Sequence, residues 1–426
     1  RGANIGVLRV DHPDIIEFIT SKKKEGQFDN FNLSVGITDT FIKALEKNTD
    51  YNLINPVKNK IIGKIKAKKV FNLIAESAWA CGDPGLLFLD RINAKHPLRL
   101  LGEIETTNPC GELPLLPYES CNLGSINLSQ MIDENNKIDW NKLKSTTHTA
   151  IRFLDNVIEV NNYPFKEIET TTKNNRKIGL GVMGFAEILL KLEISYNSKK
   201  AVKTAGEIMS FIRKESLNAS KKLATERGVF PNWKKSVHAR YNRKIRNATL
   251  CSIAPTGTIS IIADTTSSIE PLFALAYKRK NVLDGKDLVE INSLFLEYIK
   301  RQKINQKKLI NKLLNKGNIT SLAGLTKKTK SMLLTALEIP YSQHIRIQAE
   351  FQKYVDNSVS KTVNLPHEST IDDVKKSYLL AYKLGCKGIT IFRYGSKTQQ
   401  LLELGLDEEV YEAEYFTKCD PYACKL

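Results

Sequence analysis

The chain has 426 residues, of which 42% are hydrophobic, enough to bury the core of one large enzyme domain or of two or three smaller ones. Its formal net charge is +18, but the lysine runs behind it are scattered and lack interleaved aromatic residues, so we expect a solvated surface and no specific nucleic-acid partner. The absence of an apolar run of ~20 residues and of a signal-peptide pattern predicts a cytoplasmic chain without membrane association, and the sparse cysteines indicate a reducing compartment.

Hydrophobic periodicity predicts strands alternating with helices, beginning with strands at residues 7–10 and 28–35 around a helix at 14–20. This alternation favours an α/β architecture. We expect residues 47–66 to be a Lys-rich and Asn-rich surface stretch. The other expected elements are helices at 39–46, 67–80, 142–161, 199–226 and over most of 287–356, a Gly-punctuated strand running into a helix at 176–185, a buried strand at 247–254, a strand at 359–364, a helix capped by Thr370 that ends at Gly385, and a last strand at 387–392.

The strongest chemical signal lies at residues 107–112, Thr-Asn-Pro-Cys-Gly-Glu. Pro109 and Gly111 favour a loop, which presents Cys110 beside Glu112. A carboxylate raises the pKa of a neighbouring thiol, so this pair suits radical chemistry better than acyl transfer. The alternative from local chemistry alone is a turn that carries a buried cysteine.

Asn-Pro-Cys-Gly-Glu, followed by Glu-Ser-Cys-Asn-Leu-Gly-Ser, resembles the finger loop and next strand of ribonucleotide reductases, most closely the class II enzymes that use adenosylcobalamin. The resemblance implies a ten-stranded α/β barrel of two antiparallel halves. Residues 1–397 would supply mainly the second half and the finger loop, and residues 398–426 a flexible redox tail. The implied activity is thiyl-radical conversion of ribonucleotides, for example ribonucleoside diphosphates, to deoxyribonucleotides for DNA synthesis.

Roles for the loop residues follow from the resemblance. Cys110 would carry the thiyl radical that takes the 3′ hydrogen of the ribose, Glu112 would accept the 3′-hydroxyl proton, and Asn108 would hydrogen-bond the substrate hydroxyls. Cys121 would be one half of the dithiol that reduces the substrate, although it equally fits a packed strand residue. The other half lies upstream in the family, and Cys81, at the end of a predicted helix, is not assigned that role.

A segment of hydroxyl residues and glycine directly follows the predicted strand at 247–254. Backbone N–H groups and hydroxyls can converge on a phosphate there, although such segments are commonly plain turns. In the family this segment holds the substrate phosphates. Its residues are Pro255, Thr256, Gly257, Thr258, Ile259 and Ser260.

Cys419 and Cys424 lie near the C-terminus in a segment with little apolar content. A zinc site is the alternative, but it needs a second ligand pair, and none lies nearby. We therefore expect a swinging dithiol that re-reduces the internal disulfide and is served by a thioredoxin-like reductant. The histidines show no metal-ligand spacing, so no metal site is predicted, and Cys251 and Cys386 are expected to be buried and inert.

In the family, the segment that begins at Arg1 lies well inside the protein. We therefore expect an upstream N-terminal fragment of the same enzyme, a homodimer when complete, and no sustained turnover by this chain alone. One alternative is the large subunit of a class I enzyme, but class I carries two adjacent tyrosines at the positions that match Thr390 and Ile391. Another is a catalytically silent, basic, nucleic-acid-associated fragment.

Overall fold

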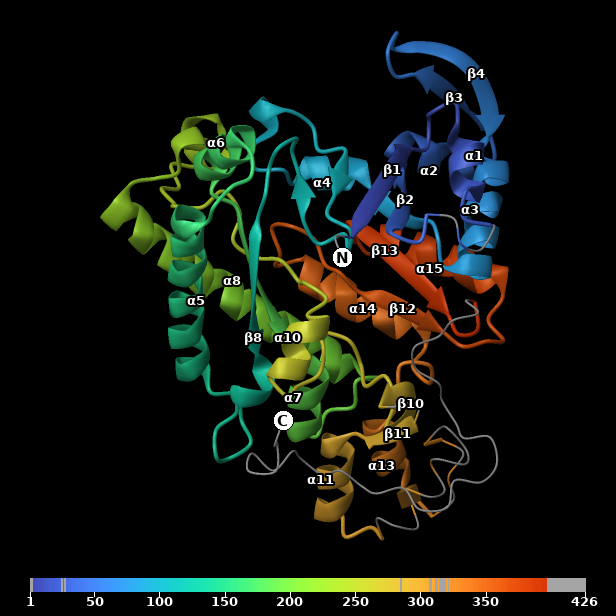
Figure 1. The fold of residues 1–426 in the computed structure, drawn as a ribbon, viewed down its shortest axis with the longest axis vertical. Helices are drawn as coiled ribbons and strands as arrows, with labels where there is room; N and C mark the ends of the chain where they lie inside the picture. The colour runs from blue at the N-terminus through green and yellow to red at the C-terminus, as the bar shows by residue number, and fades with distance from the viewer. Residues whose placement is uncertain are drawn as a thin grey trace.

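The computed structural model describes residues 3–396 except 24–25, 27, 284–285, 306–308, 311–312, 314–318, 321 and 323. Strands and helices alternate through most of this chain, so the predicted mixed α/β class is confirmed (Figure 1). The predicted redox tail at 398–426, with Cys419 and Cys424, lies outside the described residues.

The largest sheet has five strands in the order β1-β2-β5-β13-β12. Neighbours are parallel except at the junction of β5 with β13, which is antiparallel. Two oppositely directed sets of parallel strands therefore meet in this sheet, as expected for a barrel of two antiparallel halves. The strands are β1 (Asn4–Arg9), β2 (Phe31–Ile37), β5 (Gly85–Phe88), β12 (Thr362–Leu365) and β13 (Gly388–Arg393).

A second parallel pair, β8 (Asn122–Asn127) and β9 (Ile178–Met183), extends the set that contains β12 and β13. Residues 247–254 lie between β9 and the segment before β12, and bridge to each of them once. Within the described part of the chain, no ladder joins β8 to β1 to close the barrel.

Residues 247–254 are buried, as predicted, but they form isolated bridges where a continuous strand was expected. The reason is Asp356, whose carboxylate accepts hydrogen bonds from the backbone N–H groups of Leu250 (2.8 Å) and Cys251 (3.2 Å). Arg213 donates to the same carboxylate at 2.5 Å. A side chain therefore replaces main-chain partners at this point in the ladder.

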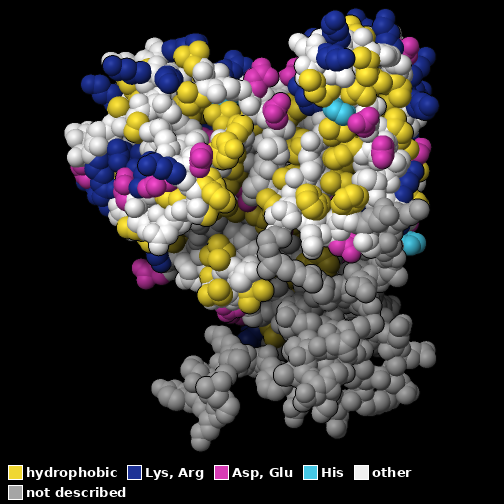
Figure 2. All heavy atoms as spheres, turned by 45° about the horizontal axis from the view of Figure 1, so that its top comes forward, with side chains coloured by type: hydrophobic (Ala, Val, Ile, Leu, Met, Phe, Trp, Pro, Cys, Tyr) yellow, Lys and Arg dark blue, Asp and Glu magenta, His cyan; other side chains and the backbone are white. Residues whose placement is uncertain are grey.

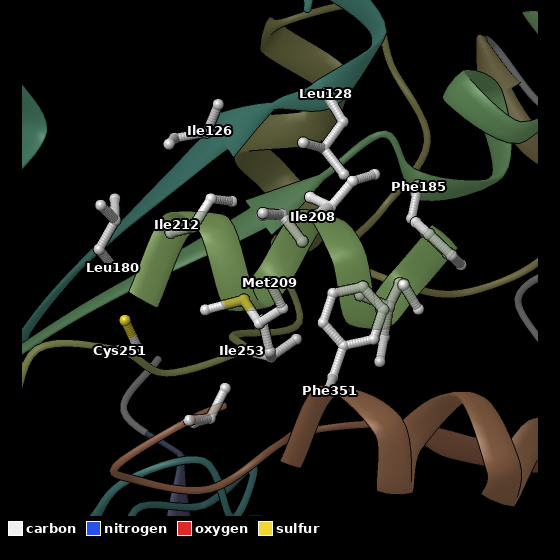
Figure 3. Packing of buried hydrophobic residues seen from close by; sticks show 14 of the residues in the cluster. Ile126, Leu128, Leu180, Phe185, Ile208, Met209, Ile212, Cys251, Ile253 and Phe351 are labelled. Atoms are coloured by element: carbon white, nitrogen blue, oxygen red, sulfur yellow. The ribbon is translucent and has the colours of Figure 1, made fainter. Parts of the chain in front are cut away.

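Helices cover both sets of strands, and the largest buried cluster lies where α8 packs against β8, β9 and α14. Figure 3 shows Ile208, Met209 and Ile212 of α8 in this core, with Phe351 of α14 pointing toward them. The helices are α1 (Ile15–Thr20), α2 (Asp39–Glu46), α3 (Ala67–Cys81), α4 (Leu89–Ala94), α5 (Trp140–Val160), α6 (Lys166–Asn175), α7 (Phe185–Lys191), α8 (Lys199–Arg227), α9 (Val237–Arg240), α10 (Gly257–Ile262), α11 (Ser293–Arg301), α13 (Lys327–Met332), α14 (Tyr341–Gln352) and α15 (Ile371–Lys383), with short 3-10 turns η1 (Arg99–Leu101), η2 (Leu128–Gln130) and η3 (Pro231–Lys235).

Three hairpins complete the described structure, and two of them differ from the sequence prediction. The expected surface stretch at 47–66 contains a hairpin, and part of the expected helical region at 287–356 is a strand. The first hairpin turns where Asn55 Oδ1 accepts the N–H groups of Val57 (3.0 Å) and Lys58 (2.9 Å). The hairpin strands are β3 (Asp50–Asn55) with β4 (Lys60–Lys66), β6 (Thr106–Thr107) with β7 (Pro114–Leu115), and β10 (Ala276–Leu283) with β11 (Lys286–Ile291).

Three glycines of β9 and its end have G-x-G-x-x-G spacing, but their role is strand packing. A Cβ on Gly181 would lie 2.1 Å from Ser252 O, and one on Gly179 would lie 2.8 Å from Ser252 Cβ. Gly184 begins α7 with φ +76°. The close approach at Gly179 and Gly181 is therefore between β9 and the extended segment at 247–254.

On the face shown in Figure 2, Lys and Arg lie mainly on the outer flanks, and apolar side chains gather along the hollow between two lobes. None of the helices in the described ranges combines the length and apolarity needed to cross a bilayer.

Candidate active site

Cys110 lies at the tip of the loop between β6 and β7. Asn108 shapes this loop, because its side-chain oxygen accepts a hydrogen bond from Leu113 N (2.9 Å) and its backbone N–H donates to Leu113 O (3.1 Å). Gly111 donates its N–H to Asn108 O (3.0 Å) and has φ +81°, a conformation that favours glycine. The amide oxygen of Asn108 thus holds the loop, and its side chain also hydrogen-bonds the Glu112 carboxylate.

The loop tip forms one wall of a small cavity of about 30 Å³. The other walls come from β1, β2, β5, β13, α14 and the segment before β12. Asn32 of β2 anchors the tip by donating to Pro109 O at 2.7 Å. Because residues from both sets of strands line the cavity, Cys110 is presented to the interior of the barrel fold. The lining residues are Ile5, Ser34, Leu86, Leu87, Pro109, Cys110, Gly111, Gln348, Val359, Lys361, Gly388, Ile389 and Thr390.

Glu112 follows the tip and is only 2% exposed. Its backbone carbonyl accepts hydrogen bonds from Ser358 N (2.8 Å) and Ser252 Oγ (2.9 Å), whereas its Oε2 has no partner in the described structure. Burial raises the pKa of Glu112. The pKa of Cys110 is also raised, first by desolvation and then by the Glu112 carboxylate, which is the direction that the sequence predicts.

Cys121 is half-buried immediately before β8. Burial raises the pKa of its thiol, and the nearby Lys177 opposes that shift. Lys177 is itself buried and donates to Glu119 Oε2 at 2.5 Å, while Asn175 donates to the other oxygen of Glu119 at 2.7 Å. The Glu112 carboxylate also raises the Cys121 pKa, so both thiols belong to one electrostatic environment.

The other described cysteines have packing roles. Cys81 ends α3, as predicted, and its thiol contacts Ser77 O at 3.3 Å. Cys251 and Cys386 are buried, and burial raises the pKa of each thiol to about 12. Neither of these two is therefore a ready thiolate at neutral pH.

The expected phosphate segment at 255–260 forms the start of a short helix. Thr256 precedes α10 with φ +56°, and its hydroxyl accepts a hydrogen bond from Ser268 N at 2.7 Å. Gly257 and the next two residues are exposed, while Ser260 is buried and donates to Gly257 O at 3.2 Å. None of the six residues lines the cavity at Cys110.

An ionic cluster lies at the cavity wall around the buried Lys361, and the sequence analysis did not identify it. The Lys361 ammonium donates to the Glu270 carboxylate, to His344 Nδ1 (3.0 Å) and to Thr362 O (3.1 Å). Glu270 also accepts the N–H of Thr362 at 2.8 Å. Burial lowers the pKa of Lys361, which Glu270 opposes, and burial also lowers that of His344. The available signal was a lysine inside the strand predicted at 359–364.

A larger pocket of about 340 Å³ lies between η2, α7 and α11 and contains none of the predicted site residues. No group of three or more His, Cys, Asp or Glu side chains in the described ranges is arranged to hold a metal ion.

Comparison with known proteins defines the class to which this fold belongs. Residues 1–245 and 242–392 match the family described as ribonucleotide reductase, barrel domain. The chain therefore belongs to the ribonucleotide reductase barrel-domain family, as its sequence motifs predict. A class Id ribonucleotide reductase alpha subunit from Actinobacillus ureae shares the fold with a TM-score of 0.74 and 23% identity, over 92% of this chain and 70% of that one.

Within this family, the chain is similar to two proteins named vitamin B12-dependent ribonucleoside-diphosphate reductase. It is 49% identical over 409 residues to one from Thermoplasma acidophilum, covering 96% of this chain and 53% of the relative. It is 46% identical over 430 residues to one from Mycobacterium tuberculosis, covering 100% of this chain and 62% of the relative. The chain thus spans between half and two thirds of the length of these relatives.

Proposed function

We propose that this chain is the catalytic portion of an adenosylcobalamin-dependent ribonucleotide reductase, which makes deoxyribonucleotides for DNA synthesis. The observation that carries the proposal is the presentation of Cys110 to a cavity between two opposed sets of strands, with the buried Glu112 directly behind it. The names of the relatives from T. acidophilum and M. tuberculosis support the same activity and cofactor.

The chemistry replaces a sugar hydroxyl by hydrogen. The Cys110 thiyl takes the 3′ hydrogen atom and becomes a thiol, Glu112 accepts the 3′-hydroxyl proton, and Asn108 holds the hydroxyls through its amide. The bond between the 2′ carbon and its oxygen breaks and water leaves. Cys121 and a second thiol supply two electrons and two protons and close to a disulfide, after which Cys110 returns the hydrogen atom. One ribonucleotide and one dithiol thus give one deoxyribonucleotide, water and one disulfide.

The residues around Cys110 fit a radical source bound beside the cavity. Gly388, Ile389 and Thr390 form the β13 wall, and no tyrosine or tryptophan lines the described cavity. A radical relay through the protein needs oxidisable side chains next to the acceptor thiol, and these positions cannot supply them. Bound adenosylcobalamin supplies the radical that activates the thiol.

Substrate phosphates would be held at residues 255–260. The exposed first turn of α10 supports this role, since its leading N–H groups and Thr258 face solvent and can donate to an anion. Glu270, which follows this region in the sequence, pairs with Lys361 at the cavity wall, and this pair would help to fix the distance between the phosphates and the reacting sugar.

The catalytic portion would comprise residues 1–397, and residues 398–426 would form the redox tail. There Cys419 and Cys424 would re-reduce the internal disulfide by thiol–disulfide exchange and would in turn be reduced by a thioredoxin-like protein. The complete enzyme would include an upstream N-terminal segment, which would supply the second active-site thiol, and would act as a homodimer in the reducing cytoplasm.

Two sets of cysteine variants test these thiol roles in the enzyme reconstituted with that N-terminal segment. Cys110→Ser should abolish deoxynucleotide formation with every reductant, because an alcohol does not form the radical. The double variant Cys419→Ser with Cys424→Ser should remain active with dithiothreitol and fail only with a protein reductant. Equal loss of the double variant with both reductants contradicts the shuttle role of the tail.

A further inference from the structure

One face of α14 carries a row of buried polar side chains directed at the strands that surround the cavity. His344, Gln348 and Gln352 are spaced four residues apart, so they lie on the same face of the helix, and they are 0%, 1% and 2% exposed. Gln352 donates its amide N–H to Asn357 O at 3.2 Å, and Gln348 donates to Gly388 O of β13 at 2.9 Å. Gln348 and Gln352 thus donate to main-chain carbonyls of β13 and of the segment before β12.

Gln348 differs from the others because half of its amide has no partner. Its nitrogen faces Gly388 O and, at 3.5 Å, Val359 O. Both partners can only accept, so the orientation of the amide is fixed and its oxygen must point away from them. This oxygen is buried and has no hydrogen-bond partner in the described structure, whereas the oxygen of Gln352 accepts from Ser358 Oγ at 3.5 Å.

Gln348 also lines the cavity that Cys110 enters. A volume of about 30 Å³ holds about two water molecules or one edge of a larger ligand. The lysine on the same wall, Lys361, has its three N–H groups engaged by Glu270, His344 and Thr362. Gln348, whose buried oxygen has no partner in the described structure, is therefore part of the wall of the cavity at Cys110.

We propose that Gln348 Oε1 accepts a hydrogen bond from a sugar hydroxyl of a nucleoside ligand held against Cys110. This inference rests on the proposed function and adds a specificity-determining residue to it. A ligand without that hydroxyl would leave the buried oxygen unpaired, which is the condition under which a site discriminates strongly. The hydroxyl can belong to the ribose of the substrate or to the adenosyl group of the cofactor, and the experiment separates these sources.

The test uses Gln348→Met, which keeps the length of the side chain and removes the acceptor. Gln352→Met is the matched control, because it removes an equally buried amide from the same helix face outside the cavity. In the reconstituted enzyme, dissociation constants are measured for a ribonucleotide, for its 2′-deoxy and 3′-deoxy analogues, and, by absorbance titration, for adenosylcobalamin. Thermal unfolding is recorded for each variant.

We expect Gln348→Met to weaken binding of the hydroxyl-bearing ligand by roughly three- to tenfold, the range of a single buried hydrogen bond, and to leave the analogue without that hydroxyl unchanged. Loss with the ribonucleotide identifies the substrate ribose, and loss with adenosylcobalamin identifies the cofactor. Equal effects of the two variants, or none, would show that the oxygen bonds only water and would overturn the proposal.

If Gln348→Met does not fold, the wild-type enzyme still provides a test: equal affinity for the ribonucleotide, for both deoxy analogues and for cofactor analogues without sugar hydroxyls overturns the inference. A wild-type enzyme that binds neither ribonucleotide nor adenosylcobalamin refutes the proposed function instead.

Discussion

At the residue scale, Glu112 is the group whose environment bears most directly on the chemistry. Burial raises its pKa above the ordinary value, and a general base must be ionised to work. The rate should therefore fall as pH decreases through that raised pKa. Glu112→Gln should lower kcat by about 10²- to 10⁴-fold and remove the acidic limb from the pH profile. Measurement of kcat/KM against pH for both proteins checks this, and a Gln variant with the wild-type rate and profile would exclude Glu112 as the base.

His96 is a second residue with an unusual environment. It is 2% exposed, and neither of its ring nitrogens has a hydrogen-bond partner in the described structure. Burial lowers its pKa to about 3, and Lys177, Lys387 and Arg99 add to this effect. The ring is therefore neutral in the folded protein at neutral pH.

This environment predicts a pH-dependent stability. Because the pKa of His96 in the folded state, about 3, lies below its ordinary value of 6.5, the unfolded chain binds the proton first. Stability is therefore complete above pH 6.5 and is lost as the pH falls toward 3. Protonation of His96 in the unfolded chain should lower the free energy of unfolding by about 2 kcal/mol at pH 5, relative to its value above pH 6.5.

Urea unfolding of wild type and His96→Met at pH 7 and pH 5 measures this difference. The variant should be as stable as wild type at pH 7, or more so, because its side chain needs no hydrogen bonds, and it should lose less stability on acidification. His12→Met, at a side chain with 22% exposure, is the control. Identical pH dependence in wild type and His96→Met would contradict the prediction.

At the element scale, the close contact of β9 with the segment at 247–254 limits which substitutions β9 can tolerate. A methyl group on Gly181 would collide with Ser252 O, so Gly181→Ala should destabilise the fold by roughly 1–3 kcal/mol or more. Gly257 has no heavy atom within 4 Å of an added Cβ, so Gly257→Ala should change stability by less than about 0.5 kcal/mol. Denaturant unfolding compares the two, and equal effects would show that β9 is not packed this tightly.

The sequence predicts helices and strands well where one face of the element is buried. It predicts them poorly where their hydrogen-bonding partners are distant in the sequence or where the element is exposed. The periodicity locates α3, α5, α8 and α15 within a few residues, and the capping box at Thr370 and Asp373 is present. The β3–β4 hairpin was missed because much of it is exposed, so it shows little apolar alternation. The hydrogen bonding of residues 247–254 depends on the carboxylate of Asp356. This residue is distant in the sequence, so no local pattern reveals the contact.

Some residues of the candidate site could likewise be predicted from the sequence, and others could not. Cys110 and Glu112 are close in sequence, and their unusual neighbourhood can be read directly. Lys361 and Gln348 gain their meaning only from the packing of α14 on the strands around the cavity. In a sequence, a buried glutamine on a helix cannot be distinguished from one in solvent.

At the scale of the whole molecule, the meeting of two opposed sets of strands at β5 and β13 could not be derived from periodicity and was implied by the family resemblance. This junction places Leu86 and Leu87 of one set opposite Ile389 and Gly388 of the other, around the tip that carries Cys110. In the proposed function, the composition of this wall decides where the radical can originate.

The radical source is tested most directly by assaying the reconstituted enzyme with adenosylcobalamin and without any second, metal-bearing protein. Thr390 lines the cavity, Ile391 is buried beside it, and the next residue, Phe392, lacks a phenol, so a tyrosine relay would be broken at its last step. We predict that deoxynucleotide forms under these conditions and that a tyrosyl-radical scavenger has no effect. Activity that requires a di-metal partner protein and ignores adenosylcobalamin would contradict this assignment.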